Sequence, residues 1–275
     1  MRYYLLIMKD KVVIITGASS GIGKALAYEM ASRGAFVVLA ARSLDVIKEI
    51  ENDLVSRGNH TFAVKTDVSR EEECRDLVNA TVAKFGRIDA LINNAGISMR
   101  AIFSETDVSV IRKLMDINFW GTVYCTKFAL PHLIKSGGSV VGVSSIAGFK
   151  GLPGRTGYSA SKFAMQGFLE TLRIENLKTG LHVMIACPGF TASNIRKTAL
   201  AADGSQQGES PRDEGGMMSA EEVARRIADG IVSRKKVLIM TMQGKMTVLL
   251  NKFFPTFMDK MVYNHMAKEP DSPFK

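Results

Sequence analysis

Cysteine, histidine and long apolar runs are all scarce in this 275-residue sequence. The three cysteines, Cys74, Cys125 and Cys187, lie far apart, and no C-x-x-C pair occurs. The four histidines form no pair at metal-ligand spacing. These absences argue against a disulfide framework and against a zinc site, and they are typical of a protein from a reducing compartment. We therefore expect no bound metal and a cytoplasmic location.

The sequence also lacks a recognisable membrane span or secretion signal. No apolar run approaches the ~18 residues that a membrane helix needs. The run Tyr3–Met8 is shorter than the apolar region of a secretion signal, roughly 7–15 residues, and no cleavage site follows it. Met8 leads directly into the first expected strand, so it is an alternative start that would make residues 1–7 an upstream extension.

Positive charge is in excess, and the excess is uneven. Lys and Arg number 36 against 27 Asp and Glu, which gives a formal net charge of +9. Residues 234–275 hold eight basic and three acidic residues, and so supply +5 of this charge. Such a segment suits a solvated surface, an acidic membrane surface, nucleic acid or an acidic carrier protein. No aromatic side chains interleave with the basic ones in a stripe, so we expect no nucleic-acid partner.

Short apolar segments alternate with longer amphipathic ones along the chain. The apolar segments lack polar alternation, which is typical of a parallel sheet covered on both faces. We expect strands at 12–16, 36–41, 61–64, 90–93, 139–144, 182–187 and 237–240. We expect helices at 22–33, 44–56, 70–85, 107–115, 118–136, 159–179 and 219–233. The pattern predicts an α/β fold with a doubly wound parallel sheet of the Rossmann type.

We expect one catalytic domain over residues 8–243 and a C-terminal helical extension over 244–275 packed on it. Apolar residues recur every three to four positions across 246–266, with lysines between them. Pro255 should kink or restart this helix. Three roles stay open for the extension: packing on the core or across a dimer, a wall of the substrate site, and contact with a membrane surface.

A glycine-rich turn follows the first expected strand and opens a helix. Its sequence is Thr16-Gly17-Ala18-Ser19-Ser20-Gly21-Ile22-Gly23. Glycines let backbone N–H groups approach a pyrophosphate, and the helix N-terminus favours negative charge. In isolation such a turn also fits an ordinary strand–helix connection, because its spacing is not that of the better-known G-x-G-x-x-G fingerprint.

The end of the second strand indicates which dinucleotide binds. NAD-binding proteins carry an acidic residue there, roughly 20 residues past the glycines, to hold the ribose 2′-hydroxyl. This chain has Ala41, Arg42 and Ser43 instead. A guanidinium suits a 2′-phosphate through paired hydrogen bonds. The sequence therefore predicts NADP(H) rather than NAD(H).

Tyr158 and Lys162 lie four residues apart on an expected helix and so share one face. A free phenol has a pKa of about 10, too high for efficient acid–base work near neutrality. A nearby ammonium favours the phenolate and lowers that pKa. Ser145 follows the fifth strand and is placed to hydrogen-bond a substrate oxygen.

Taken together, these motifs resemble those of the short-chain dehydrogenase/reductase family. The matching positions are TGASSGIG at 16–23, Asp67-Val68, NNAG at 93–96, Asn118, Ser145, Tyr158-x-x-x-Lys162 and Pro188-Gly189. The layout, with its C-terminal extension, is similar to that of the branch containing 11β-hydroxysteroid dehydrogenase. The resemblance covers residues 12–190 and implies a nicotinamide-dependent oxidoreductase.

The resemblance implies a role for each matching position. The residues implied to bind the cofactor are Gly17, Ser19, Ser20, Gly21, Ile22, Gly23, Arg42, Ser43, Asp67, Val68, Asn94, Ala95, Gly96, Tyr158, Lys162, Pro188, Gly189 and Thr191. For the hydroxyl that holds the carboxamide, Ser193 is the alternative to Thr191. The implied catalytic residues are Asn118, Ser145, Tyr158 and Lys162. Tyr158 would move the proton, Ser145 polarise the carbonyl, Lys162 lower the tyrosine pKa, and Asn118 hold a water leading to solvent.

The segments expected to border the substrate are mostly apolar. By analogy with the family they are Ile97, Ser98, Met99, Phe149, Leu152, Phe190, Ile195, Leu200, Met217 and Met218. They favour an apolar carbonyl or secondary alcohol over a sugar. Residues 191–218 would form a lid over the bound ligand.

The sequence thus predicts an NADP(H)-dependent oxidoreductase that acts on an apolar carbonyl or secondary alcohol. Two alternatives stay open: a 3-oxoacyl-carrier-protein reductase, and a catalytically idle NADP(H)-sensing or scaffold protein. Family practice implies a homodimer or homotetramer through the helices at 118–136 and 159–179. The small residues Gly121, Ala160 and Ala164 would allow close helix approach there.

Overall fold

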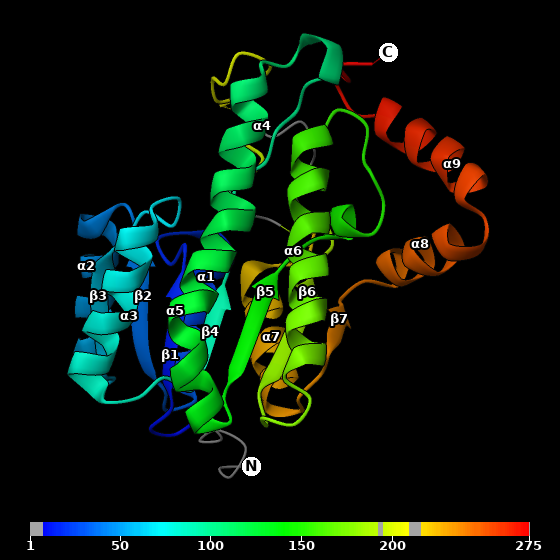
Figure 1. The fold of residues 1–275 in the computed structure, drawn as a ribbon. Coiled ribbons are helices and arrows are strands. Elements are labelled where there is room, and N and C mark those ends of the chain that lie inside the picture. The colour runs from blue at the N-terminus through cyan, green and yellow to red at the C-terminus, as the bar shows by residue number, and fades with distance from the viewer. Residues whose placement is uncertain (1–7, 192–194, 209–215, 275) are drawn as a thin grey trace.

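A seven-stranded parallel sheet forms the centre of the molecule in the computed structural model (Figure 1). The structure describes residues 8–191, 195–208 and 216–274. The strand order is β3-β2-β1-β4-β5-β6-β7, and every neighbouring pair is parallel. The strands are β1 Val12–Thr16, β2 Phe36–Ala41, β3 Thr61–Lys65, β4 Ala90–Asn93, β5 Ser139–Val143, β6 His182–Cys187 and β7 Val237–Ile239. The predicted doubly wound parallel sheet is confirmed.

Helices cover both faces of the sheet. One apolar core lies between the sheet and α1 (Gly21–Ser32), α2 (Leu44–Ser56) and α7 (Ala220–Val232). A second core lies under α3 (Glu71–Phe85), α5 (Gly121–Ser136) and α6 (Thr156–Glu175). β1, β4, β5 and β6 are buried along their whole length, which explains why their sequences are continuously apolar rather than alternating.

The strand order reverses between β1 and β4, so the first three strands are added toward one edge of the sheet and the later strands toward the other edge. β2 and β3 lie on one side of β1, whereas β4 and all later strands lie on the other side. In doubly wound sheets this switch point opens a crevice at the carboxyl ends of the strands, where ligands bind. The glycine-rich turn follows β1 at this edge, and the sequence 93–96 follows β4 at the same edge.

Some helix boundaries differ from the predicted ones. The segment predicted as one helix over 118–136 is divided: α4 (Val108–Met115) leads into a π-helical turn, Asp116–Trp120, and α5 begins only at Gly121. The helix predicted at 159–179 spans Thr156–Glu175, so Tyr158 lies in its first turn. Gly121 is packed against Val68 of its own chain, so its small size serves internal packing, and the expected contact between subunits stays a prediction.

Pro255 restarts the C-terminal helix, which is one of the two outcomes expected for it. α8 spans Met242–Phe253, and α9 spans Pro255–Ala267 with the proline in its first turn, where no backbone N–H is needed. Met258 and Met266 are the buried apolar residues of α9. Beyond α9 the chain reaches the segments that follow β4 and precede α6, and Glu269 is buried between Arg100 and Arg155.

Candidate active site

The glycine-rich turn has a backbone that only glycine accommodates easily. Gly17 and Gly21 have positive φ angles, +65° and +51°. A Cβ on Gly23 would lie 2.0 Å from the carbonyl oxygen of Gly17, and one on Gly17 would lie 2.8 Å from the Cα of Ala95. The turn is therefore held directly against the segment that follows β4, at the switch point of the sheet.

Hydrogen bonds from Thr16 and Asn94 fix this turn. The backbone N–H groups of Asn94 and Ala95 both donate to Thr16 Oγ1, at 3.0 Å each. The amide nitrogen of Asn94 donates to the carbonyl oxygen of Thr16 at 2.9 Å. Asn94 thus braces the two strand ends, and the floor of the crevice is a connected polar network.

The N-terminus of α1 suits an anionic group. Ser20 occupies the N-cap position, but its side chain makes no capping hydrogen bond, and the first turn contains no acidic residue. The first N–H groups of a helix have no intrahelical acceptor and carry partial positive charge. Ser19, Ser20, Gly21 and Ile22 line the cleft here, so these donors are available to a phosphate.

Arg42 and Ser43 line the cleft at the end of β2, and Thr66, Asp67 and Val68 line it beyond β3. Arg42 is exposed. Asp67 accepts hydrogen bonds from the backbone N–H and hydroxyl of Ser69, which orient its carboxylate. The guanidinium of Arg42 and the oriented carboxylate of Asp67 therefore lie at the end of the cleft that is predicted to receive adenosine.

Tyr158 and Lys162 come from successive turns of α6 and both line the cleft. The Lys162 ammonium lies 5.8 Å from the centre of the Tyr158 ring and donates a 2.9 Å hydrogen bond to the carbonyl oxygen of Val143. Its side chain is almost fully buried. Burial lowers the pKa of Lys162 to about 8, because water no longer stabilises the ammonium.

The pKa of Tyr158 differs from the predicted direction. Burial raises it above its ordinary value, and hydrogen bonding to Ser145 and the positive charge of Arg155 oppose that rise. The hydrogen bond of the Lys162 ammonium goes to the carbonyl oxygen of Val143. Burial therefore outweighs the opposing effects on the pKa of Tyr158.

Ser145 lies two residues beyond β5, at the N-cap of a short 3₁₀ turn, Ile146–Gly148. Its hydroxyl accepts a 3.2 Å hydrogen bond from the Ala147 N–H and faces the cleft. Gln166 supports this turn: its amide nitrogen donates to Ser144 Oγ at 2.8 Å and to the Ser145 carbonyl oxygen at 3.3 Å. The sequence analysis missed Gln166, although its position four residues after Lys162 places it on the same helical face.

Asn118 lies in the π-helical turn, a feature often found at functional sites. Its amide accepts from the N–H of Ile97 at 2.8 Å and donates to the Ile97 carbonyl oxygen at 3.0 Å. It also donates to Ser161 Oγ at 2.9 Å. Asn118 thus ties the segment after β4 to α6. Its predicted role in holding a water stays a prediction.

The cleft that Ser145, Tyr158 and Lys162 line has a volume of about 440 Å³, whereas Asn118 is fully buried and does not line it. Of the residues expected to border the substrate, it is lined by Ile97, Ser98, Leu152, Phe190, Ile195 and Leu200. Met99, Phe149, Met217 and Met218 do not line it. Met99 is buried in a small apolar cluster beneath, and Phe149 and Met218 pack against the main cores.

The floor of the cleft after β6 comes from Pro188, Gly189 and Thr191, which all line it. Gly189 must be small, since a Cβ there would lie 2.5 Å from Cγ2 of Thr241. Thr191 is buried, and its hydroxyl donates to the Gly189 carbonyl oxygen at 3.1 Å. The alternative Ser193 and part of the predicted lid lie outside the described residues. Within the described part of the chain, no cluster of His, Cys, Asp and Glu is placed to hold a metal ion.

Comparison with known proteins identifies the family of the chain. The family model described as short chain dehydrogenase matches residues 11–204. An 11-beta-hydroxysteroid dehydrogenase-like 4A from Arabidopsis thaliana is 41% identical over 83% of this chain and 75% of its own length. Among solved structures, a short chain dehydrogenase/reductase from Burkholderia phymatum in complex with NAD superposes with a TM-score of 0.82 at 24% identity, covering 91% of this chain and 95% of its own. An alcohol dehydrogenase from Thermococcus sibiricus complexed with 5-hydroxy-NADP gives 0.75 at 26% identity, covering 84% and 96%. The chain therefore belongs to the short-chain dehydrogenase family of oxidoreductases.

Proposed function

We propose that this protein is an NADP(H)-dependent oxidoreductase that interconverts an apolar carbonyl and the corresponding secondary alcohol. The observation that carries the proposal is the convergence of Tyr158, Ser145 and Lys162 in one cleft that also contains the open N-terminus of α1. This cleft joins an acid–base group to a phosphate-binding turn, which is the combination that a nicotinamide oxidoreductase needs.

The cofactor preference rests on the end of β2. Ala41, Arg42 and Ser43 provide a cation and a hydroxyl and no carboxylate that would repel a 2′-phosphate. The two structural relatives are complexed with NAD and with 5-hydroxy-NADP, so the family fold accepts either cofactor. The choice in this chain is therefore assigned to Arg42.

The chain's own residues divide the chemistry between them. The bound nicotinamide would supply or accept the hydride. Tyr158 donates its proton to the substrate oxygen in the reductive direction and accepts it in the oxidative direction. Ser145 donates a hydrogen bond to the same oxygen as negative charge develops there. Lys162 holds its charge behind Tyr158 from a site fixed by Val143, and Asn118 holds the wall of the cleft through Ile97.

The substrate class follows from the side chains at the other end of the cleft. Ile97, Leu152, Phe190, Ile195 and Leu200 are apolar and line it. Such a wall favours an apolar ketone or alcohol. The relative from Arabidopsis thaliana is named for activity on a hydroxysteroid, which supports this class.

The test measures NADPH oxidation across ketones, steroids, quinones and an acetoacetyl thioester, with Tyr158→Phe as the matched inactive form. We expect turnover with an apolar carbonyl that disappears in Tyr158→Phe while NADPH still binds. Turnover confined to the thioester would favour the carrier-protein reductase. Tight NADPH binding without turnover on any substrate would favour the idle, cofactor-sensing role.

The cofactor preference has its own test. Arg42→Ala should weaken NADPH binding by roughly 10-fold or more and leave NADH binding nearly unchanged, because only the 2′-phosphate loses a charged partner.

We also propose that the protein forms a homodimer or homotetramer through α5 and α6. Exposed aromatic side chains, Trp120 and Phe163, lie at the start of α5 and on α6. Sedimentation of the wild type against a Trp120→Ser, Phe163→Ser variant tests this assembly, and an unchanged mass in the variant would contradict it.

A further inference from the structure

The C-terminal helices expose apolar side chains along one face each. On α8, Met242, Met246, Leu249 and Phe253 follow one another at spacings of three and four residues, which places them on a single face. On α9, Phe257 and Met261 lie four residues apart, and Phe254 lies at the junction between the two helices. We call these seven residues the apolar face. Each of the seven is between 46% and 72% exposed.

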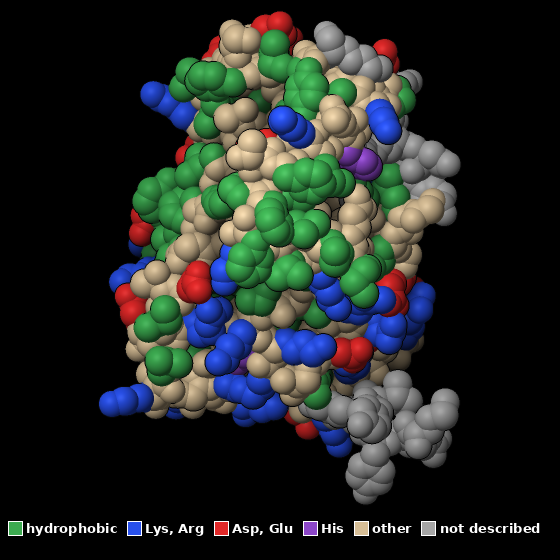
Figure 2. All heavy atoms as spheres, turned by 90° about the vertical axis from the view of Figure 1, so that its right-hand side faces the viewer, with side chains coloured by type: hydrophobic (Ala, Val, Ile, Leu, Met, Phe, Trp, Pro, Cys, Tyr) green, Lys and Arg blue, Asp and Glu red, His purple; other side chains and the backbone are tan. Residues whose placement is uncertain are grey.

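Figure 1 places α8 and α9 one above the other at one flank of the molecule, with α8 next to β7. Figure 2 views that flank and shows hydrophobic side chains gathered across its middle, with Lys and Arg side chains gathered next to them. Isolated exposed apolar residues are ordinary on protein surfaces, but a contiguous group of large ones marks a contact surface.

The charges around the apolar face are mostly positive. Lys245 and Lys252 each lie three residues after an apolar-face residue of α8, and Lys260 lies on α9. All three are exposed. Of the three acidic residues of the same region, Asp259 pairs with Lys150 and Glu269 is buried between two arginines, whereas Asp271 is exposed in the segment after α9.

We propose that the apolar face lies on an anionic membrane surface, with α8 and α9 parallel to the membrane plane and the lysines at the level of the lipid headgroups. Amphipathic helices with apolar and lysine-bearing sides bind membranes in this orientation. Anionic lipid attracts each lysine near the surface. A second copy of this chain fits less well, because a two-fold contact would bring the same lysines together. In the described part of the chain no helix is long and apolar enough to span a bilayer.

The helix α9, which carries part of the apolar face, contacts a residue that lines the cleft. The ring of His265 on α9 lies 6.4 Å from the ring of Phe190, which lines the cleft. On α8, Asn251 donates a 3.2 Å hydrogen bond to the carbonyl oxygen of Phe149. An apolar substrate dissolved in the lipid would therefore meet the cleft close to the membrane. This last step rests on the proposed function, whereas membrane binding itself does not.

Vesicle flotation tests the proposal with the full-length protein and phosphatidylcholine vesicles, with and without phosphatidylserine. We expect the wild type to float with the phosphatidylserine-containing vesicles and to be released by salt, which screens the lysines. Leu249→Ser/Phe253→Ser should lower binding to these vesicles by at least about tenfold, because two apolar side chains no longer insert. Lys245→Glu/Lys252→Glu should lower it by at least about tenfold as well, through repulsion from the anionic lipid.

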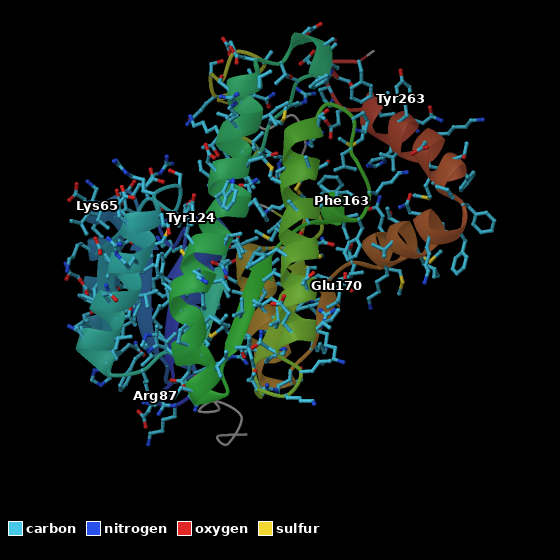
Figure 3. All side chains as sticks on the ribbon, in the orientation of Figure 1. Lys65, Arg87, Tyr124, Phe163, Glu170 and Tyr263 are labelled. Atoms are coloured by element: carbon cyan, nitrogen blue, oxygen red, sulfur yellow. The ribbon has the colours of Figure 1, made fainter. Side chains whose placement is uncertain are left out.

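The matched control is Val55→Ser/Lys65→Glu, which removes an exposed apolar side chain and reverses a charge far from the apolar face. Lys65 lies on the opposite flank from α8 and α9 in Figure 3, and Val55 is an exposed residue of α2. This variant should float like the wild type. Circular dichroism and NADPH binding show that each variant is folded, and flotation does not depend on turnover.

Two results would overturn the proposal. One is a wild type that stays out of the vesicle fraction at low salt. The other is a wild-type dimer in sedimentation that Leu249→Ser/Phe253→Ser converts to a monomer while lipid binding is absent, which would assign the apolar face to a second copy. A wild type that floats but turns over no carbonyl would leave membrane binding intact and count against the proposed function alone.

Discussion

Replacing Gly121 with alanine should destabilise the protein and weaken binding at the adenine end of the cleft. Gly121 begins α5 with ordinary helical angles, φ −57° and ψ −39°, so alanine causes no backbone strain. Its Cβ, however, would lie 2.7 Å from Cγ2 and 3.1 Å from the carbonyl oxygen of Val68. Carbon atoms pack at about 3.5–4.0 Å, so Val68 or α5 must move by about 1 Å.

The change in the free energy of unfolding caused by Gly121→Ala is a balance of two opposing effects. Overpacking a core costs about 1–3 kcal/mol, and the better helix propensity of alanine returns up to about 1 kcal/mol. We expect a net loss of about 1 kcal/mol in the free energy of unfolding, which lowers the Tm of a chain of this size by about 2–4 °C. NADPH binding should weaken as well, because Val68 lines the cleft.

Thermal unfolding followed by circular dichroism measures the effect, with Gly167→Ala as the matched control. Gly167 is an exposed helical glycine of α6 with nothing within 4 Å of its Cβ position, so alanine there should stabilise the protein by about 0.5–1 kcal/mol. Val68→Ala, combined with Gly121→Ala, should cost less than the sum of the two single changes. A Tm for Gly121→Ala at or above that of the wild type, or strict additivity in the double variant, would refute the reasoning.

Three further predictions concern the catalytic helix and its supports. Burial lowers the pKa of Lys162 to about 8 in the folded protein, so the unfolded chain binds more protons above that pH. The free energy of unfolding of the wild type, relative to that of Lys162→Met, should therefore rise with pH from about 8 to about 10. Urea unfolding of both proteins at several pH values measures this difference, and a difference that falls with pH would contradict the reasoning. Ser145→Ala should lower kcat by about 10²–10³-fold and raise the pKa of Tyr158, because the hydrogen bond that favours the phenolate is lost; an unchanged pH–rate profile would argue against contact between the two residues. Glu269→Ala should lower the free energy of unfolding by about 3 kcal/mol, because Arg100 and Arg155 lose a buried counter-charge. A change below about 0.5 kcal/mol in urea unfolding would show that the two ion pairs of Glu269 contribute little to stability.

The sequence predicted the parts of the fold that local patterns determine. The strands β1, β2, β4 and β6 were placed at their observed bounds, because each is a continuous apolar run between turn residues. The π-helical turn at Asp116–Trp120 was not predicted; it contains Asn118, whose amide hydrogen-bonds to the backbone of Ile97, 21 residues earlier. A contact between segments so far apart leaves no local periodicity.

In the candidate site, too, local motifs predicted some features, whereas features that depend on long-range contacts were missed. The residues carried by motifs, such as Tyr158, Lys162 and Arg42, line one cleft, but the motif does not reveal the protonation state of Tyr158, which depends on burial. Gln166 and Glu269 support the site and were missed. Glu269 in particular lies 114 residues from Arg155 in the chain, and only the return of the chain after α9 brings the two together.

The join between β1 and β4 also governs how the molecule folds. Val12 pairs with Phe36 in β2, whereas its N–H donates to Asp89, 77 residues later, where the second half of the sheet begins. Contacts of such long sequence separation require large loops to close and slow the folding of a domain. Each half of the sheet has its own nearby strand pairs, but the cleft exists only after the halves meet. A ligand that spans the cleft therefore binds only the product of this slow step, so it stabilises the native state without accelerating its formation.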